Sequence, residues 1–168
     1  MSELVIRRLS AADAADYRAI RLAALSQDAP AFGSTYEAEA PRALAEFAAR
    51  LESAAVFAAF ADRVVVGMAG FRRCTGAREA HKAFLWGTFV EPAWRRRGTA
   101  RALLAALLAA ATAEVEQLTL SVVQDNAAAI ALYRECGFQV YGTEPRALKS
   151  AHGYSDEVLM VRFLSARA

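Results

Sequence analysis

Four arginines and one glycine gather between residues 95 and 101, in the run Arg-Arg-Arg-Gly-Thr-Ala-Arg. From Thr99 to about Ala113, leucine and alanine recur at helical spacing, which predicts a helix that begins directly at this run. The first turn of a helix leaves about four backbone N–H groups without partners and carries roughly half a positive charge. Gly98 would let a ligand approach the backbone, and the arginines would add neutralising charge. We therefore expect this segment to bind a pyrophosphate.

Two common phosphate-binding sequences are absent from this segment, which has neither the Gly-Lys-Ser/Thr of a P-loop nor the Gly-x-Gly-x-x-Gly of a dinucleotide-binding turn. An alternative is a nucleic-acid-binding module that uses the arginines and stacks bases on Trp94. However, Glu114 and Glu116 end the predicted helix, and the net charge of the chain is only +2. A wide basic surface is therefore not indicated, and nucleic acid is not the expected partner.

The composition sets the broad class of protein. A chain of 168 residues, 56% hydrophobic and 23% charged, can bury the core of one domain, so we predict a single domain over residues 1–168. No apolar run approaches the roughly 18 residues of a membrane span, and residues 1–9 lack a signal-peptide core, so we expect a cytoplasmic protein without a membrane partner. Cys74 and Cys136 are isolated in the sequence, as are both histidines, which predicts free thiols and no metal site.

Strand and helix patterns alternate along the chain. We predict a strand over 3–8, a helix capped by Asp13 that runs to about Gln27, a loop broken by Pro30 and Gly33, and a helix from Pro41 to Leu51. Two apolar runs around Asp62-Arg63 predict a hairpin. The predicted elements after the first two helices are strands at 54–61, 64–71, 82–90, 118–123, 138–142 and 158–164, with helices at 99–113 and 126–136.

The order of these elements predicts the fold class. The central strand–helix–strand unit implies one parallel pair, whereas the hairpins imply antiparallel pairs. We therefore predict an α/β (α+β) fold, with a mixed, mostly antiparallel, twisted sheet of about seven strands and helices on both faces.

Two motifs within this order resemble a known family. Arg95-x-x-Gly98-x-Ala100, after a strand that ends Val90-x-Pro92, resembles the acyl-CoA-binding motif of the GNAT N-acetyltransferase superfamily. The second motif, with Asn126 at a helix start, Tyr133 seven residues later and Gly137-Phe138 beyond, is similar to that family's next segment. The ending from Tyr154-x-Asp156 to Met160 also fits the family's last strands.

The resemblance implies an N-acetyltransferase that moves the acetyl group of acetyl-CoA to a primary amine, by direct attack on the thioester. The acceptor would be a small-molecule amine or a protein amine, and homodimers are frequent in the family. Transfer of a longer acyl group, or a non-catalytic relative that only binds acyl-CoA, is the alternative. The expected acyl-CoA contacts are Phe89, Val90, Arg95, Arg96, Arg97, Gly98, Thr99, Ala100, Arg101 and Asn126.

Tyr133 is the expected catalytic residue. Residues seven apart complete nearly two helical turns, so Asn126 and Tyr133 share one face of the predicted helix. A phenol, with a reference pKa of about 10, can protonate the departing CoA thiolate. The alternative is a tyrosine that only packs under the sheet.

A carboxylate base is not identified. Many members of the family carry one three or four residues before the equivalent of Val90, where this chain has Gly87 and Trp86. Glu91, Glu79 and His81 are nearby, but each is also typical of a solvated surface.

The expected acceptor site lies between the loop after the first helix and the loop before the last strand. The first loop supplies Phe32, Tyr36, Glu37 and Glu39, and the second supplies Tyr154. Aromatic rings and carboxylates suit a cationic, partly apolar amine. Alternatively, Glu37 and Glu39 are an ordinary solvated helix start, where the helix dipole favours acidic residues.

Overall fold

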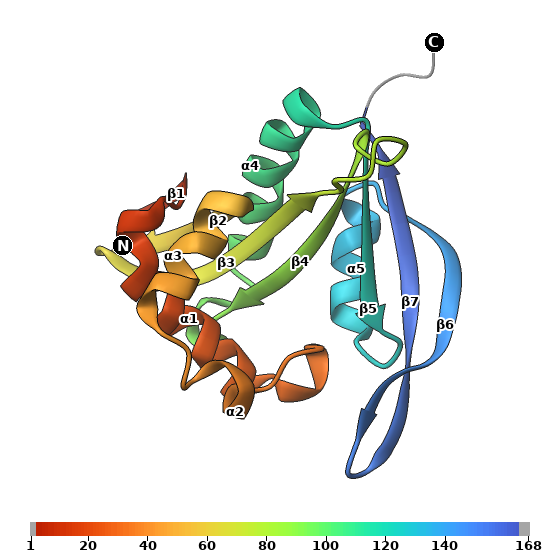
Figure 1. Ribbon diagram of the computed structural model, residues 1–168, viewed down its shortest axis with the longest axis horizontal. Coiled ribbons are helices and arrows are strands. Elements are labelled where there is room, and N and C mark those ends of the chain that lie inside the picture. Colours follow the sequence, from red (N-terminus) through yellow and green to blue (C-terminus); the bar gives the residue numbers. More distant parts are fainter. Residues whose placement is uncertain (1–2, 165–168) are drawn as a thin grey trace.

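The computed structural model describes residues 3–164 and contains a seven-stranded sheet in the order β1-β2-β3-β4-β5-β7-β6 (Figure 1). Only β4 and β5 are parallel, and every other neighbouring pair is antiparallel. The predicted mixed, mostly antiparallel sheet is thus confirmed. The predicted domain also includes residues 1–2 and 165–168, which lie outside the described residues. The strands are β1 (Leu4–Arg8), β2 (Ala55–Ala61), β3 (Val64–Arg73), β4 (Lys82–Val90), β5 (Gln117–Val123), β6 (Gln139–Ser150) and β7 (Gly153–Phe163).

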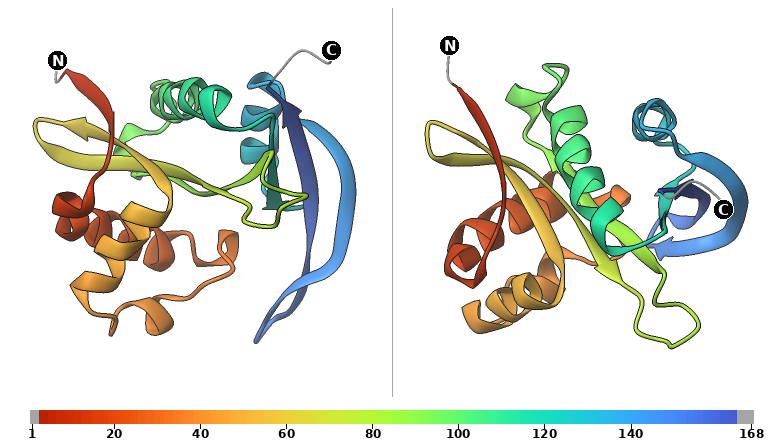
Figure 2. Two further views of the ribbon diagram at one scale, coloured as in Figure 1. Left: turned by 45° about the horizontal axis from the view of Figure 1, so that its top comes forward. Right: turned by 90° about the horizontal axis from the view of Figure 1, so that it is seen from above.

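Helices cover both faces of the sheet, as Figure 2 shows: α4 and α5 lie on one face, and α1 and α3 on the other. The leucine stripe of α4, which includes Leu103, Leu104 and Leu107, is fully buried, and α4 packs mainly against β2 and β3. Tyr17 of α1 and Phe47 of α3 are buried on the opposite face, with their ring centroids 6.1 Å apart. None of the helices within residues 3–164 is long and apolar enough to cross a membrane. The helices are α1 (Ala14–Gln27), α2 (Tyr36–Glu39), α3 (Leu44–Ser53), α4 (Thr99–Glu114) and α5 (Ala127–Glu135).

The sheet opens between its two parallel strands. β4 pairs with β5 only over Lys82–Phe84, against Gln117–Thr119, and the strands then diverge (Figure 1). A bulge lies just beyond the last pair, because on β3 only Ala69 stands opposite Gly87 and Thr88 of β4. Gly87 has a φ of +70°, a conformation that glycine adopts without a steric penalty. The second half of β4 therefore has one edge without a partner strand.

Three sequence predictions about local structure were wrong. The helix predicted to begin at Pro41 begins at Leu44, where the Glu46 carboxylate accepts a hydrogen bond from the N–H of Ala43 at 2.9 Å. The predicted loop around Tyr36 contains the single turn α2, capped by the Thr35 hydroxyl. β6 and β7 are far longer than predicted, because they continue as an exposed two-stranded ribbon whose register shifts between Glu144 and Leu148.

A buried carboxylate ties the three N-terminal helices together. Glu39 of α2 accepts hydrogen bonds from Nε and Nη2 of Arg21 at 3.1 and 2.8 Å, and from Nη1 of Arg50 at 3.1 Å. The Glu39 side chain is only 3% exposed. Burial alone would raise the pKa of Glu39, but the hydrogen bonds and charge of Arg21, with help from Ser34 and Arg50, lower it to about 2.

This network predicts an acid-sensitive stability. Glu39→Gln leaves two largely buried arginines without their counter-charge, so we expect a loss of about 3–5 kcal/mol in the free energy of unfolding. At about 2–4 °C per kcal/mol, the melting temperature should fall by roughly 10 °C. Glu37→Gln, on the exposed side of the same short helix, should change stability by less than about 0.5 kcal/mol.

The pH dependence of stability follows from the lowered pKa of Glu39. A carboxyl group whose pKa is lower in the folded protein stabilises it above the unfolded value, and this contribution disappears as the pH falls. The contribution of Glu39 should therefore be complete above pH about 4.5 and lost by pH about 2, a change of about 3 kcal/mol. Denaturant titrations across this range should show that loss in the wild type and not in Glu39→Gln. Identical pH profiles would contradict the assignment.

Candidate functional site

A hollow, which we call the cradle, lies at the start of α4, where the sequence predicts a pyrophosphate-binding segment. Its cavity has a volume of about 740 Å³. Gly98 is the N-cap residue of α4, with a φ of +80°, and a Cβ placed on it would meet no atom within 4 Å. Arg96 also has a positive φ, of 59°. The lining residues are Val90, Arg95, Arg96, Gly98, Thr99, Ala100, Arg101, Ala128, Ala131, Leu132 and Glu135.

The backbone of this hollow is suited to an anion. Within residues 3–164, the backbone N–H groups of residues 96–101 donate no well-formed hydrogen bond, whereas Ala102 donates normally to the carbonyl of Gly98. Successive free N–H groups at a helix start, next to residues with positive φ, form an anion-binding concavity. The open space around Gly98 leaves room for phosphate oxygens to reach these groups. The structure therefore fits a pyrophosphate here.

The arginines of the cradle differ in their availability. Arg95 is already used, because its Nε donates to the carbonyl of Val90 and its Nη2 to Asp28, both at 2.8 Å. The guanidinium of Arg97 lies 5.3 Å from the ring centroid of Trp94. Arg101 forms an exposed ion pair with Glu135 across the mouth of the hollow. Arg96 has no such partner among the described residues, which leaves it the arginine most available to a ligand.

Three of the predicted acyl-CoA contacts are placed outside this lining. Phe89 is buried on the face of α1 and α3, Arg97 stacks on Trp94, and Asn126 caps α5 through a hydrogen bond from the N–H of Ala129 at 3.2 Å. Their role in binding the cofactor stays a prediction. The contribution of α5, whose small residues Ala128 and Ala131 line the cradle, was not predicted from the sequence. The alanine run at 127–129 could have indicated such a surface.

Tyr133 lies under the open part of the sheet. Its side chain is buried, at 7% exposure, and its ring packs edge-on against Phe138 with centroids 5.9 Å apart. Burial raises the pKa of Tyr133, and the nearby Thr88 hydroxyl offsets part of that rise. The phenol is thus protonated throughout the neutral range.

Two polar groups that flank Gly87 are left unsatisfied. Trp86 Nε1 and Thr88 Oγ1 are buried, and neither makes a well-formed hydrogen bond within residues 3–164, although the Thr88 hydroxyl lies close enough to Tyr133 to affect its pKa. A buried polar group without a partner costs about 1–3 kcal/mol, so such groups are rare and need an explanation. Both lie at the bulge where β4 has parted from β5. A ligand beside this strand would explain them.

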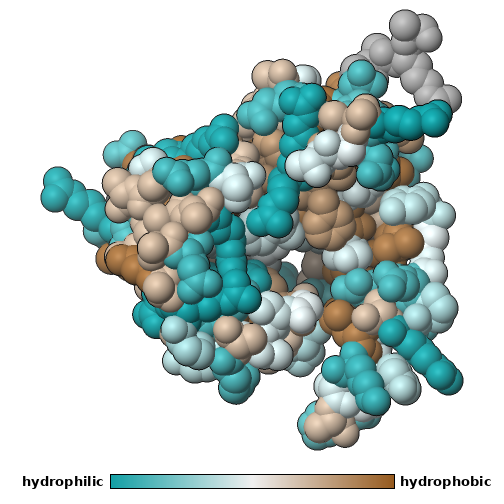
Figure 3. All heavy atoms as spheres, in the orientation of Figure 1, coloured by the Kyte–Doolittle hydropathy of each residue, from teal (hydrophilic) through white to brown (hydrophobic). Residues whose placement is uncertain are grey.

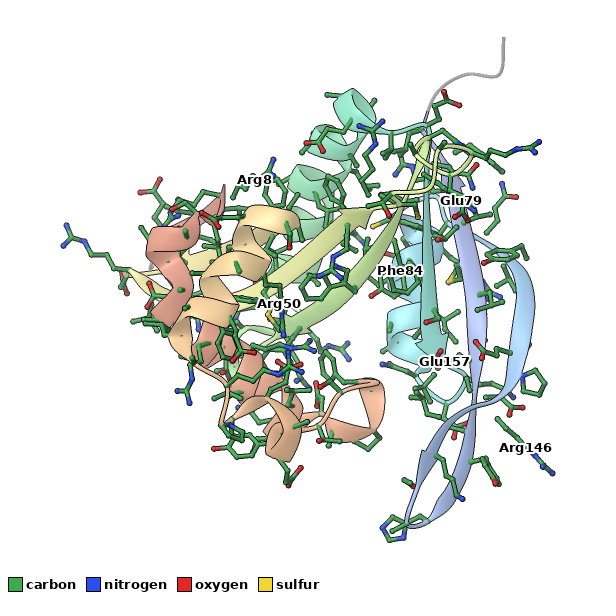
Figure 4. The ribbon with its side chains drawn as sticks, viewed as in Figure 1. Arg8, Arg50, Glu79, Phe84, Arg146 and Glu157 are labelled. Carbon is green, nitrogen blue, oxygen red and sulfur yellow. The ribbon has the colours of Figure 1, made fainter. Side chains whose placement is uncertain are left out.

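On the other face of β4 lies a second hollow, with a volume of about 700 Å³. Figure 3 shows a recess at the centre of the molecule, with hydrophilic residues on the side of the N-terminal helices. Figure 4 shows Arg50 and Phe84 on opposite sides of this space, with Glu157 of β7 farther across the gap. We call this hollow the arginine pocket. Its lining residues are Arg21, Glu39, Arg42, Arg50, Arg72, Arg73, Cys74, Thr75, Phe84 and Trp86.

The residues expected to contact an acceptor are divided among three places. Phe32, Tyr36 and Glu37 line a third hollow of about 690 Å³ with residues of the β6–β7 ribbon, so the two predicted segments do meet. Tyr154 is not part of that lining. Its side chain is exposed, and its ring lies 5.0 Å from the guanidinium of Arg146. Glu39 lines the arginine pocket, where both of its oxygens are held by arginines.

None of the substitute bases named from the sequence lies within 4 Å of the position of a Cβ on Gly87, where, among the described residues, only Nη1 of Arg21 is found. Glu79 pairs with Lys82, and it lies with His81 beyond the closed end of the diverging strands. Glu91 accepts a hydrogen bond from Gln27 at 3.3 Å. Among residues 3–164, no group of three or more His, Cys, Asp or Glu side chains is placed to hold a metal ion.

Comparison with known proteins identifies the family. The model of the acetyltransferase (GNAT) family matches residues 19–138. The chain is 30% identical over 166 residues to the L-amino acid N-acetyltransferase AaaT of Escherichia coli K12, covering 96% of this chain and 99% of that protein.

Solved structures agree with this fold. A GNAT-family acetyltransferase from Streptococcus pneumoniae superposes with a TM-score of 0.87 at 22% identity, over 97% of this chain and all of that one. YncA, a proposed acetyltransferase from Salmonella typhimurium solved with its cofactor acetyl-CoA, has a TM-score of 0.82 at 25% identity, over 99% and 97% of the two chains. With the cradle at α4 and the parted strands β4 and β5, these matches show that the chain belongs to the GNAT family of acyl-CoA-dependent acetyltransferases.

Proposed function

We propose that this protein transfers the acetyl group of acetyl-CoA to the primary amine of a small molecule, by direct attack of the amine on the thioester. The observation that carries the proposal is the second half of β4, which pairs with β3 but has no partner strand on the side of β5, together with the two buried polar groups that flank Gly87. The cradle lies on one side of this strand and the arginine pocket on the other. A donor and an acceptor could therefore meet at the bulge from opposite faces.

Two relatives support the choice of acetyl-CoA as the donor and of an amino acid as the acceptor. YncA of Salmonella typhimurium was solved with acetyl-CoA, and the Escherichia coli relative is named for acetylation of L-amino acids. A free L-amino acid is thus the first acceptor to test. Acetyl-CoA bound at this site would supply an activated acyl group. The free N–H groups of residues 96–101 would hold its pyrophosphate, and the open edge of β4 would orient its pantetheine arm.

In the proposed reaction, the amine nitrogen forms a bond to the carbonyl carbon while the carbon–sulfur bond breaks. The nitrogen loses one proton and the sulfur gains one. Tyr133 is the proposed proton donor to the sulfur, because it is buried, protonated and adjacent to Thr88 on the open half of β4. The role of Phe89, Arg97 and Asn126 in holding the cofactor would be indirect, through the strand, loop and helix that they support.

The amine must reach the site without its extra proton. For a lysine-like amine, with a pKa of about 10.4, deprotonation at pH 7 costs roughly 4–5 kcal/mol, whereas an α-amine near 7.8 costs only about 1 kcal/mol. No carboxylate base from the sequence-based candidates faces the bulge. An α-amine is therefore favoured over a lysine side chain.

The direct test is release of CoA thiol from acetyl-CoA, measured against a panel of amino acids, polyamines and peptides, with the acetylated product identified by mass. We expect turnover with at least one α-amine. Binding of acetyl-CoA without any turnover would favour a non-catalytic relative. Faster turnover with propionyl-CoA than with acetyl-CoA would favour transfer of a longer acyl group.

If the cradle binds the cofactor, a substitution at Gly98 should abolish acetyl-CoA binding. Gly98→Glu places a side chain and a negative charge where the pyrophosphate is expected. In the wild type, acetyl-CoA at a hundred times its dissociation constant should stabilise the fold by about 2.7 kcal/mol, and Gly98→Glu should lose this shift. Ala105→Glu adds the same charge on an exposed turn of α4 and should keep it. Equal shifts in all three proteins would show that the cradle is misassigned.

Tyr133→Phe separates binding from chemistry. The ring remains to pack against Phe138, but the transferable proton is lost, so acetyl-CoA stabilisation should persist while kcat falls about 100-fold or more. Tyr141→Phe, on the exposed face of β6, is the matched control and should leave kcat unchanged. If Tyr133→Phe retained full kcat in single-turnover measurements, the residue would be structural only.

A further inference from the structure

The arginine pocket carries a large surplus of positive charge on the acceptor side of β4. Its lining holds five arginines and a single carboxylate, that of Glu39. Both oxygens of Glu39 are engaged by Arg21 and Arg50. These two guanidinium groups come from α1 and α3 and are largely buried, at 8% and 15% exposure. Glu39 therefore fixes the arginines in place rather than offering a free charge to a ligand.

Several donors in this pocket remain available. Arg21 uses Nε and Nη2 for Glu39, whereas its Nη1 lies 3.6 Å from the point where a Cβ on Gly87 would stand. Arg72 lies over the ring of Trp86, at 6.0 Å from its centroid, and has no ion pair among the described residues. Arg42, which also lines the pocket, likewise has no ion pair within residues 3–164. The available guanidinium donors thus extend from the bulge of β4 to the outer rim of the pocket.

We propose that the arginine pocket binds the carboxylate of an amino-carboxylate acceptor and thereby presents its α-amine at the bulge of β4. This inference rests on the proposed acetyl transfer and names the acceptor class and the residues that select it. A planar carboxylate is the ligand that guanidinium groups bind with paired hydrogen bonds. Trp86 and Phe84 supply an apolar wall for the rest of the acceptor. Polyamines and lysine side chains, which add positive charge, are excluded by the same field.

The same charges favour the neutral form of the bound amine. A nearby positive charge disfavours an ammonium ion, and at an effective dielectric constant of about 20 a unit charge 10 Å away lowers an amine pKa by about one unit. The bound carboxylate would cancel only part of the surplus. The positive charge of the arginines thus favours loss of the amine proton, which is the role of the carboxylate base that was not found at Gly87.

The charged groups around the bound amine come from several elements. Arg21 lies on α1, Arg50 on α3, Arg72 on β3 and Glu39 on α2. Across the gap, alternation along β7 places Glu157 on the same face as Ser155, which lines the hollow beside the α1–α2 segment. Glu157 is the carboxylate whose effect on the amine would oppose that of the arginines. The remaining charged side chains of the pocket are Arg42 and Arg73.

The acceptor class is tested with matched pairs of probes. L-leucine, L-phenylalanine and L-glutamate are each compared with the corresponding α-carboxamide, using wild-type enzyme and saturating acetyl-CoA. The acids should exceed their amides at least about 100-fold in kcat/KM, because the amide cannot replace a charge-assisted hydrogen bond. The amides contain more neutral amine at a given pH, so a preference for the acids cannot come from basicity. Equal or better use of the amides would overturn the proposal.

The contribution of individual residues of the arginine pocket is tested by substituting exposed arginines that form no buried ion pair. Arg72→Gln and Arg42→Gln should each raise KM for the preferred L-amino acid about tenfold, with little change in acetyl-CoA stabilisation. Arg78→Gln, in the loop between β3 and β4 and outside the pocket lining, removes the same charge and should leave KM unchanged. Equal KM values in all three variants and the wild type would place the carboxylate elsewhere.

The pH profile of kcat tests the effect on the amine. The rate should rise as the bound amine loses its proton, and Arg72→Gln should move this rise to higher pH by up to about one unit. Glu157→Gln should keep the rise. Loss of the rise in Glu157→Gln would identify that carboxylate as the base and overturn the role of the arginine field.

A binding measurement without turnover distinguishes failure of the carboxylate site from failure of the proposed acetyl transfer. With CoA bound and no reaction under way, L-amino acids should raise the melting temperature of the wild type more than their amides do, and Arg72→Gln should remove the difference. This result without turnover would contradict acetyl transfer but support the carboxylate site. Turnover of amines that lack a carboxylate, with no stabilisation by L-amino acids, would support acetyl transfer and overturn the arginine pocket as the acceptor site.

Discussion

The parting of β4 from β5 after three paired residues is the constraint on which the candidate site depends. β5 continues beside β7, while β4 continues beside β3 and bends at the bulge of Gly87. A strand inside a complete sheet has no free backbone groups, so a ligand could approach it only through side chains. By leaving its partner, β4 exposes one edge between two helical layers. The bulge then changes which faces receive Trp86, Thr88 and Phe89.

Both hollows beside β4 are electropositive, but they are built from different groups. In the cradle the charge comes from backbone N–H groups at the start of α4, which a glycine with positive φ leaves accessible. Such dipoles are fixed by the helix and need no further support. In the arginine pocket the charge comes from long side chains, whose freedom must be restrained before they can select a ligand. Glu39 supplies that restraint, and this accounts for a fully charged carboxylate in a nearly dry position.

The sequence predicted the parts of the site that lie within single segments. β4 has the predicted bounds, Lys82–Val90, because aromatic and aliphatic residues fill it and Pro92 ends it. Gly98 and the leucine stripe of α4 are equally local signals. The arginine pocket could not be predicted in this way. Its arginines lie between positions 21 and 73 on four separate segments, with no periodic pattern that relates them.

Glu39 shows why such long-range relations change a residue's interpretation. Next to Glu37 it has the composition of an acidic, solvated helix start, and a contact with a cationic amine was a reasonable prediction. In the fold, α1 and α3 bring Arg21 and Arg50 to its two oxygens, and its side chain becomes almost inaccessible. Glu39 therefore does not bind a cationic ligand itself. It holds Arg21 and Arg50 in place, and these arginines favour an anionic ligand. Likewise, the length of the β6–β7 ribbon depends on pairing between exposed residues that show little apolar alternation.

The ionisation states of groups in the site restrict what the pH dependence of the rate can report. Glu39 stays charged because its pKa is lowered to about 2, and Tyr133 stays neutral because burial raises its pKa. Glu39 and Tyr133 thus hold constant charge across the neutral range. A change of rate with pH in that range would then report chiefly on the acceptor's own amine, whose proton is the one that the arginine pocket is arranged to weaken.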